Sequence, residues 1–241
     1  MSIIDSYLAK KEENRKVRAP GVYYVTELCG PCERDAIYGH VLDYPADVES
    51  RRVFASGSMI EDFWINIVAN TPGFKIVGTQ LMARHTEDID GDLCEIHGRI
   101  DALVQHPNTE LVIHEVKSQY SNLALHGQPK DEHHYQGSFY SAKMGVSGLS
   151  IDYLDKAAML DGSRPVDLCF RVMPNPDVVP ELVARLRALH GFIRAHVLPP
   201  ASNCWKCKIS RTTGRSYCRY SELCGTNVDP WELVKAGEVP A

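Results

Sequence analysis

The feature that most constrains the fold is the stretch from residue 98 to residue 118, GRIDALVQHPNTELVIHEVKS. Two short apolar runs are joined by a Pro-Asn-Thr turn at 107–109, a pattern that predicts a β-hairpin. Asp101 interrupts the first run, and Glu115 and Lys117 interrupt the second. Side chains alternate along a strand, so Glu115 and Lys117 share one face. With Asp101 opposite them, two carboxylates and an ammonium would converge, which predicts a metal site with a catalytic lysine.

A second interpretation fits the same stretch. A hairpin whose polar residues face solvent also carries carboxylates and lysines at alternate positions. The hairpin alone leaves both interpretations open, so the choice depends on the rest of the chain.

Length and composition describe a globular protein with a sizeable core, as one domain or as one domain with an appendage. The chain has 241 residues, of which 44% are hydrophobic, and it lacks an apolar run long enough to cross a membrane. Its first residues are too charged for a signal peptide, and we expect a cytoplasmic location.

The formal net charge of -5 excludes a basic coat of the kind that binds nucleic acid regardless of sequence. It leaves room for a local basic groove, because positive residues cluster in three places. These are Arg15, Lys16 and Arg18 near the start, Arg51 and Arg52 before a predicted helix, and Lys206, Lys208, Arg211, Arg215 and Arg219 near the end.

The segments before the hairpin predict a helix and a strand. A helix from Gly57 onward has Ser56 or Ser58 as its cap, and Glu61 falls inside its apolar stretch. Residues 74–84 alternate as a strand, and residues 85–92 read as an acidic turn. Taken alone, Glu61 also fits the solvent face of its helix.

The segments after the hairpin predict a helix ended by Gly145, strands at 149–154 and 166–173, and a helix opened by Pro180. On the first of these helices, Gln136, Tyr140 and Lys143 form one polar-edged stripe. Such a stripe also occurs at an ordinary amphipathic boundary.

These residues together could hydrolyse a phosphodiester. Carboxylates at Glu61, Asp101 and Glu115 would supply hard oxygen ligands for one or two Mg²⁺ or Mn²⁺ ions, with the Val116 carbonyl as a further ligand. Lys117 would orient or deprotonate water, or stabilise the transition state.

The order of these motifs resembles a known family. Asp101 followed at hairpin distance by Glu115-x-Lys117 resembles the core of the PD-(D/E)xK nucleases. Residues 57–61 resemble the RecB-like G-x-x-x-H motif, and Gln136-x-x-x-Tyr140 resembles the Q-x-x-x-Y motif. The resemblance implies that Gln136 and Tyr140 position Lys117 or the DNA backbone.

Glu61 departs from the family pattern, which usually has histidine at this position. A carboxylate is a harder ligand than an imidazole, so we expect activity with an altered metal preference. The alternative is a nuclease site that has decayed.

Eight cysteines in a cytoplasmic chain are not expected to form disulfides. Cys94 and Cys169 stand singly in apolar runs and are interpreted as core residues. The other six form two groups, near the start and near the end of the chain. Spacing alone permits a Cys₄ zinc site.

The cysteine groups resemble a second family feature. Cys204-x₂-Cys207 and Cys218-x₅-Cys224, with Tyr220 nearby, resemble the C-terminal motif of the CRISPR-associated RecB-like exonucleases, the fourth Cas family. Cys32-Glu33-Arg34 resembles the N-terminal C-P-R-like partner of that motif. The resemblance implies a [4Fe–4S] cluster held by Cys32, Cys207, Cys218 and Cys224, with Cys204 as the alternative to Cys207 and Cys29 as a bystander.

The resemblance implies a single α/β domain over residues 1–241, with a RecB-like nuclease core and a mixed central sheet flanked by helices. Residues 22–55 and 199–226 would form a cluster lobe that joins the N- and C-terminal segments. The implied activity is metal-dependent cleavage of single-stranded DNA or DNA ends, in CRISPR adaptation with Cas1-like and Cas2-like integrase partners, or in a viral counterpart. The alternative is a cluster- or zinc-containing DNA-binding accessory protein with a decayed nuclease site.

Overall fold

The computed structural model describes residues 2–14, 18–42, 44–119, 127–156, 158–161, 167–201, 204, 207–208, 216, 218 and 220–236. The basic residues Arg15, Lys16, Lys206, Arg211, Arg215 and Arg219 lie outside the described residues. The chain divides into two compact units, each built from three separate stretches of sequence. The first unit comprises Met1–Arg15, Ala46–His85 and His97–Val179, and the second comprises Lys16–Pro45, Thr86–Ile96 and Pro180–Ala241.

The first unit contains most of the sheet. Its elements are α1 (Ile3–Glu13), α4 (Val48–Ala69), β4 (Leu111–Gln119), α5 (Asp131–Met144), β5 (Gly148–Asp155), α6 (Ala158–Asp161), β6 (Asp167–Val172), and the larger parts of β2 (Lys75–Ile89) and β3 (Asp92–Gln105). The strand order is β1-β3-β4-β5-β6, and β2 also pairs with β3. Because β4 and β5 are parallel while β3/β4 and β5/β6 are antiparallel, the predicted mixed sheet of an α/β fold is confirmed.

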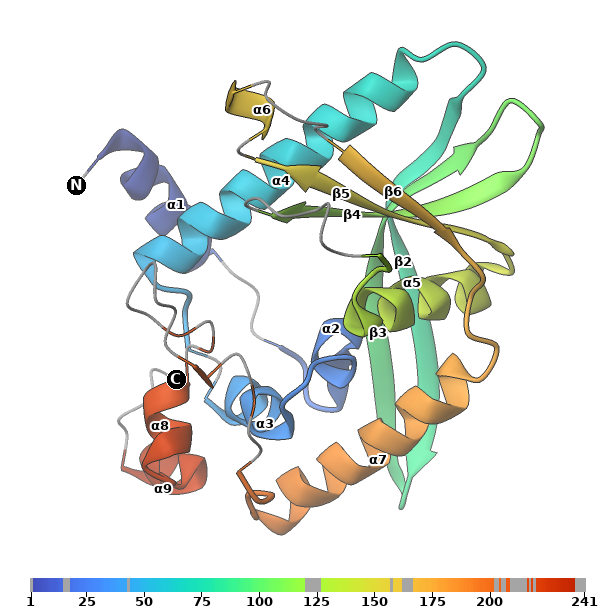
Figure 1. Ribbon diagram of the computed structural model, residues 1–241. Helices are drawn as coiled ribbons and strands as arrows, with labels where there is room; N and C mark the ends of the chain where they lie inside the picture. The colour runs from blue at the N-terminus through green and yellow to red at the C-terminus, as the bar shows by residue number, and fades with distance from the viewer. Residues whose placement is uncertain are drawn as a thin grey trace. The chain divides into compact units, whose positions relative to one another are not determined.

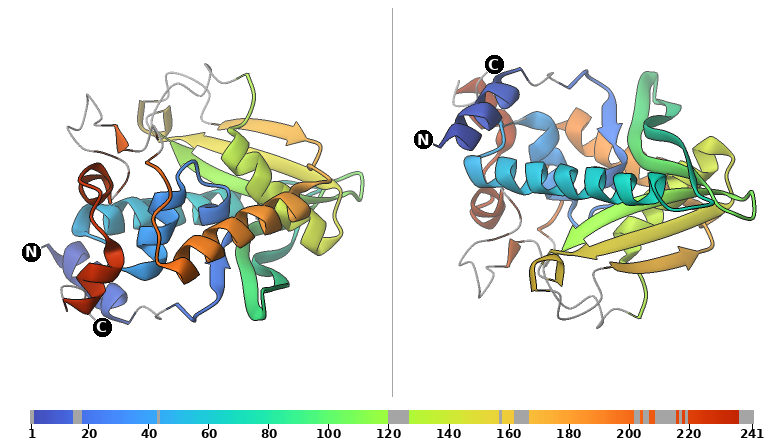
Figure 2. Two further views of the ribbon diagram at one scale, coloured as in Figure 1. Left: turned by 90° about the horizontal axis from the view of Figure 1, so that it is seen from below. Right: turned by 90° about the horizontal axis from the view of Figure 1, so that it is seen from above.

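The predicted hairpin, formed by β3 and β4, lies in the middle of this sheet. Its register pairs Ala102 with His114, and β4 pairs on its other side with β5. On one face α4 contributes to a core cluster whose buried members are Trp64, Ala102, Val104, Val116 and Leu154. Helix α5 covers the other face (Figure 1, Figure 2). The helix approaches β5 so closely that a Cβ on Gly137 would lie 2.7 Å from the Leu149 side chain.

Helix α4 begins nine residues before the predicted start. Asp47, and neither Ser56 nor Ser58, is the N-cap, and its Oδ1 accepts a hydrogen bond from the Ser50 N–H at 2.6 Å. The helix continues through Gly57, because a glycine inside a helix costs only about 1 kcal/mol and tertiary packing can offset this. The prediction of a helix carrying Glu61 is confirmed, but its start was wrong.

The acidic turn predicted at 85–92 is also corrected. Residues 85–89 belong to β2, and the turn itself consists of Asp90 and Gly91. Both residues have positive φ, 54° and 89°, as a type I′ turn between antiparallel strands requires. The Asp88 carboxylate accepts a hydrogen bond from the Gly91 N–H at 2.9 Å. An Asp-Gly pair therefore ends a long β2/β3 hairpin.

The second unit packs a segment near the start of the chain and the C-terminal segment into one core. Its elements are β1 (Val22–Tyr24), α2 (Val25–Leu28), α3 (Glu33–Val41), α7 (Val178–Ala195, from Pro180 onward), α8 (Ser221–Gly225), α9 (Pro230–Lys235) and the tip of the β2/β3 hairpin. Tyr38 stacks on Tyr220 with ring centroids 5.6 Å apart, and Leu42 and Cys218 are buried with them. In α7 a leucine stripe at helical spacing is buried, formed by Leu182, Leu186 and Leu189.

Two details complete the fold. Cys94 is buried as predicted, but Cys169 is exposed. It lies on β6 at the end of the strand order, where alternate side chains face solvent, so its interpretation as a core residue was wrong.

Among the described residues, no helix combines the length and the apolar character needed to span a bilayer.

Candidate active site

Asp101 and Glu115 come together at the β3/β4 hairpin of the first unit. Asp101 lies one residue beyond the registered pair of Ala102 with His114, on the side of Glu115. The Val116 N–H donates a hydrogen bond to Asp101 Oδ2 at 2.8 Å, which fixes this carboxylate against β4. Burial raises the pKa of Asp101, although the positive charge of Lys117 acts in the opposite direction.

Glu115 is completely buried and forms an ion pair with Lys117 through Oε1. Its second oxygen, Oε2, has no hydrogen-bond partner among the described residues. Burial, followed by the negative charge of Asp101, raises the pKa of Glu115 to about 8. A buried carboxylate with a free oxygen is unfavourable unless a proton or a cation compensates it. Glu115 is therefore a strong candidate cation ligand.

Lys117 keeps its positive charge in this environment. Burial alone would lower the pKa of its ammonium, but the carboxylates of Glu115 and Asp101 outweigh burial, and the pKa is raised. A lysine that holds its proton can orient a substrate or stabilise negative charge. This favours those two predicted roles over deprotonation of water.

Glu61 reaches the same group of carboxylates from α4. Its side chain is half-buried and its Oε1 accepts a hydrogen bond from Gln80 Nε2, so it does not lie on the solvent face of the helix. Burial, with the charge of Asp101 second, raises the pKa of Glu61 to about 7. Arg99 opposes this shift with its positive charge. The charges of Glu61 and Asp101 therefore interact, although Glu61, Asp101 and Glu115 do not by themselves form a metal-holding group among the described residues.

Gln80 and Arg99 were missed in the sequence analysis. Gln80 has a φ of 54° inside β2, in the left-handed region that a glutamine rarely adopts. The more buried positions of β2 are even-numbered up to Gln80 and odd-numbered from Leu81, which is the signature of a β-bulge. No sequence signal marks this bulge. Arg99, in contrast, was predictable, because it lies two residues before Asp101 and therefore on the same strand face.

Gln136 and Tyr140 approach the site from α5. Both are buried, and Gln136 Nε2 donates a hydrogen bond to the Tyr140 hydroxyl at 2.8 Å. Burial, followed by the charge of Glu115, raises the pKa of Tyr140. Lys143, the third member of the predicted stripe, instead interacts with His85 Nδ1 at 3.0 Å. The structure therefore places Gln136 and Tyr140, but not Lys143, beside the carboxylates.

The donor set fits a hard divalent cation. Within the described part of the chain, no three His, Cys, Asp or Glu side chains already form a metal-holding group. However, the negative charge of Asp101 raises the pKa of both Glu61 and Glu115, and Glu115 Oε2 has no hydrogen-bond partner among the described residues. A cation would satisfy both features, and oxygen-only donors suit Mg²⁺ or Mn²⁺.

The predicted cysteines gather in the second unit. Cys32 is the N-cap residue of α3. The pKa of the Cys207 thiol is raised to about 11, with burial as the largest cause. A hydrogen bond with Cys218 opposes this shift, and the charges of Cys204, Cys224 and Cys32 add to it. Cys207 thus interacts electrostatically with Cys32, Cys204 and Cys224, and Cys207, Cys218 and Cys224 pack in one core cluster, although no three of these thiols already form a metal-holding group among the described residues. Thiolates from both ends of the chain are a donor set that fits an iron–sulfur cluster.

Asp35 and Cys29 belong to the same unit as these thiols. Asp35 accepts a weak hydrogen bond from Cys218 Sγ at 3.4 Å, and burial with this carboxylate raises the pKa of Cys218. Cys29, the predicted bystander, is the C-cap residue of α2.

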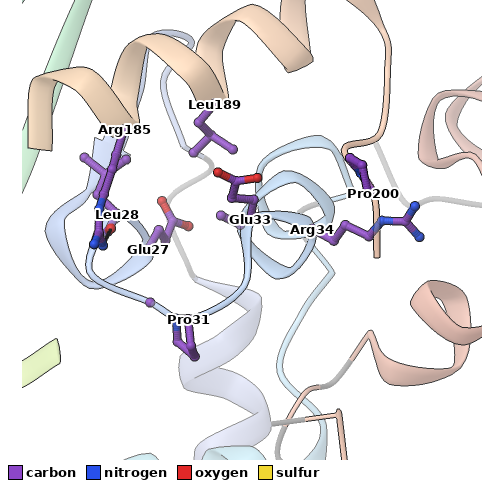
Figure 3. Close-up of a pocket in the computed structure, with 10 residues that line it drawn as sticks. Glu27, Leu28, Pro31, Glu33, Arg34, Arg185, Leu189 and Pro200 are labelled. Atoms are coloured by element: carbon purple, nitrogen blue, oxygen red, sulfur yellow. Dashed lines mark hydrogen bonds between the residues drawn. The ribbon is translucent and has the colours of Figure 1, made fainter. Parts of the chain in front are cut away.

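The second unit also contains a cavity of about 340 Å³ beside α7 (Figure 3). Arg185 Nη1 donates a hydrogen bond to the Leu28 carbonyl at 2.8 Å, and Arg34 Nε donates to the Pro199 carbonyl at 2.6 Å. Both guanidinium groups thus hold backbone segments in place, and we assign no ligand to this cavity.

Comparisons with known proteins show a shared fold. No protein-family model and no curated protein matches the sequence. Among solved structures, the chain is similar to SSO0001, with a TM-score of 0.64 and 18% sequence identity over 94% of this chain and 98% of that one. At this identity the likeness shows the fold alone.

Weaker likenesses also occur. An alkaline exonuclease, LHK-Exo from Laribacter hongkongensis, has a TM-score of 0.43 and 14% identity over 79% of this chain and 93% of that one. LHK-Exo in complex with dAMP has a TM-score of 0.42 and 16% identity over 73% and 89%. Scores this low carry no inference about the present chain.

Proposed function

We propose that this protein is a metal-dependent deoxyribonuclease of the PD-(D/E)xK type that acts on single-stranded DNA or DNA ends. One observation supports the proposal: the buried Glu115, paired with Lys117, keeps an oxygen without a hydrogen-bond partner among the described residues, and the pKa values of Glu61, Asp101 and Glu115 are all raised. Three carboxylates with raised pKa values would destabilise the fold if their role were purely structural, whereas a cation site explains them.

In this proposal Glu61, Asp101 and Glu115 hold Mg²⁺ or Mn²⁺, with the Val116 carbonyl as a further ligand. The bound cation would neutralise the non-bridging oxygens of the scissile phosphate and lower the pKa of an attacking water. Lys117, which keeps its proton, orients the phosphate and stabilises the charge that develops on it. Gln136 holds the Tyr140 hydroxyl in place beside Glu115 and Asp101.

A nuclease assay tests this proposal. Labelled single-stranded DNA is incubated with Mn²⁺ and the wild-type protein, and we expect cleavage that EDTA abolishes. Asp101→Ala and Lys117→Ala should each lower the rate by about 100-fold or more, as is usual when a group that stabilises transition-state charge is lost. Lys75→Ala, an exposed lysine of the same unit, is the matched control. Equal rates in all four proteins would refute the proposal and favour a DNA-binding accessory protein.

We also propose that Cys32, Cys207, Cys218 and Cys224 hold a [4Fe–4S] cluster, with Cys204 as the alternative to Cys207. The support is the gathering of these thiols around Cys207. Anaerobically purified protein should be brown with broad visible absorption, and Cys218→Ser should remove the colour. Colourless protein that contains stoichiometric zinc would replace this proposal with a Cys₄ zinc site.

The biological role that we propose is CRISPR adaptation, in which the protein trims DNA before spacer integration. It rests on the resemblance of the cysteine motif alone, and it implies Cas1-like and Cas2-like integrase partners. Co-expression with such proteins should yield a complex on size-exclusion chromatography. A chain that elutes alone under these conditions, while it still cleaves DNA, would favour the viral counterpart.

A further inference from the structure

A second surface of the first unit has features of a nucleic-acid site. Helices α1 and α4 lie beside each other (Figure 1) and border a cavity of about 660 Å³. The Arg52 guanidinium forms a bidentate ion pair with the Asp5 carboxylate, with distances of 2.8 and 2.7 Å, and this pair fixes α1 on α4. The residues of this α1–α4 groove that matter here are Tyr7, Lys10, Lys11, Arg51, Phe54 and Ser58.

Two aromatic rings of the groove are open to solvent. Tyr7 is 66% exposed and Phe54 is 64% exposed. Aromatic rings of this size are usually buried, so two in one groove indicate a partner with flat apolar surfaces. Unpaired bases have such surfaces and stack on aromatic side chains with little dependence on sequence.

The charge of the groove is positive, although the whole chain is acidic. Lys10, Lys11 and Arg51 contribute three positive charges to its walls. The acidic residue among the lining residues, Glu12, accepts a hydrogen bond from the Ala46 N–H at 3.0 Å through Oε1. Arg51 Nε is buried and has no hydrogen-bond partner among the described residues. Phosphates would complement these cations.

The groove leads toward the candidate active site along one helix. Arg51, Phe54, Ser58 and Glu61 follow one another at spacings of three and four residues, so they form a single stripe on α4. With a rise of 1.5 Å per residue, Phe54 lies about 10 Å along the axis from Glu61. One strand can therefore occupy the groove while its end reaches the carboxylates.

We propose that the α1–α4 groove binds single-stranded DNA, with bases stacked on Tyr7 and Phe54 and phosphates at Lys10, Lys11 and Arg51. This inference rests on the proposed nuclease function, because it supplies the path of that substrate. Interleaved rings and cations match the alternation of bases and phosphates in one strand. A duplex, whose bases are already stacked, does not match them.

Binding can be measured without cleavage. Fluorescence anisotropy of a labelled oligothymidine in EDTA reports the Kd of the full chain, and Asp101→Ala serves as a cleavage-deficient background. We expect Tyr7→Ala and Phe54→Ala each to raise the Kd about tenfold, while Phe54→Trp keeps it and Phe54→Leu does not. Phe63→Ala is the matched control, because Phe63 is 44% exposed on the opposite side of α4.

The charged contacts have a separate readout. Three phosphate contacts predict a slope of about −2 for log K against log salt, and Lys10→Ala with Lys11→Ala should reduce it by about 1.4. Lys75→Ala, an exposed lysine away from the groove, should leave the slope unchanged. Because all these side chains are partly or largely exposed, unfolding temperatures near that of the wild type will show that the variants are folded.

The proposal and the nuclease function fail in different ways. If the groove variants bind oligothymidine like the wild type, or if polyglutamate competes as well as DNA does, the groove proposal is overturned even when cleavage is present. If neither the wild type nor any variant cleaves DNA, but the groove variants bind oligothymidine more weakly than the wild type, the groove proposal is supported and the proposed nuclease function is refuted.

Discussion

A carboxylate buried as deeply as that of Glu115 is stable only when a proton or a cation compensates its charge. The pKa values of Glu115 and Glu61 are raised to about 8 and about 7, so the folded metal-free protein holds protons that the unfolded chain has already released. Their stabilising contribution is fully present below about pH 4 and is lost as the pH rises through about 8. At the residue scale, the proposed metal ion would therefore take the place of these protons.

The first prediction follows from this exchange. We expect the unfolding temperature in EDTA to fall between about pH 5 and about pH 8.5, and Mn²⁺ to restore it most at the upper end. Scanning fluorimetry at both pH values, with and without Mn²⁺, measures the effect. Glu115→Gln should flatten the pH dependence in EDTA. An Mn²⁺ effect of the same size at both pH values would contradict the prediction.

The second prediction concerns Gln80, whose amide holds Glu61. Gln80→Ala should raise the Mn²⁺ concentration needed for half-maximal thermal stabilisation by about tenfold, as is usual when the hydrogen-bond partner of a metal ligand is removed. Gln80→Gly should weaken Mn²⁺ binding equally but relieve the left-handed backbone, a gain of up to about 1 kcal/mol. Thr79→Ala, the exposed neighbour, is the control. Unchanged Mn²⁺ affinity in both Gln80 variants would exclude a positioning role.

At the scale of elements, periodic patterns were predictable and irregular features were not. The β3/β4 hairpin, the end of α5 at Gly145 and the leucine stripe of α7 follow from alternation, a glycine with φ of 64° and helical spacing. The start of α4 was predicted wrongly because Gly57 was interpreted as the beginning of the helix, whereas Asp47 is the N-cap residue. The bulge at Gln80 was missed because no local sequence pattern encodes it or the hydrogen bond from Gln80 to Glu61 on α4.

The third prediction tests the start of α4. Asp47→Ala removes the side chain that accepts the Ser50 N–H, and it should lower the free energy of unfolding by about 1 kcal/mol. Asp62→Ala, an exposed aspartate inside the same helix, should change it by less than about 0.5 kcal/mol. Denaturant titration in EDTA distinguishes the two. Equal losses would mean that the cap does not stabilise α4.

The fourth prediction concerns a buried pair between neighbouring strands. Asp152 on β5 accepts hydrogen bonds from His114 at 2.5 Å and Ser150 at 2.7 Å, and these bonds lower its pKa although burial acts to raise it. Its stabilising contribution is present at neutral pH and is lost as the pH falls below about 4. Asp152→Ala should destabilise the protein by about 3 kcal/mol at pH 7, whereas the exposed Asp167→Ala should not. A similar stability of the two variants would refute this.

At the scale of the whole molecule, each unit has its own core and its own chemistry. The three candidate carboxylates belong to the first unit and the candidate cluster cysteines to the second, although the sequence interleaves them. The sequence analysis predicted both groups from motif order. The boundaries of the units were not predictable, because they depend on contacts among stretches that are distant in sequence.

The fifth prediction follows from the separate cores. Cys218→Ala removes a buried thiol that packs with Tyr38 and Tyr220, so it should increase hydrogen exchange within residues 18–42 and 180–201. Exchange within the β3/β4 hairpin should stay unchanged. Cys169→Ala, at an exposed thiol, is the control. Increased exchange in the hairpin of the Cys218 variant would show that one cooperative unit spans both cores.

The interleaving of the units has a consequence for the architecture of the gene. Three stretches of the first unit alternate with three of the second, and the Asp90–Gly91 hairpin tip belongs to the second unit while the rest of β2 and β3 belongs largely to the first. Cleavage of the chain at one position cannot separate the two units. Deletion of residues 180–241 would leave residues 16–45 and 86–96 without the rest of the core of the second unit. A shorter gene ending before α7 would therefore encode an incomplete second unit, so the two units are expected to be inherited and expressed together.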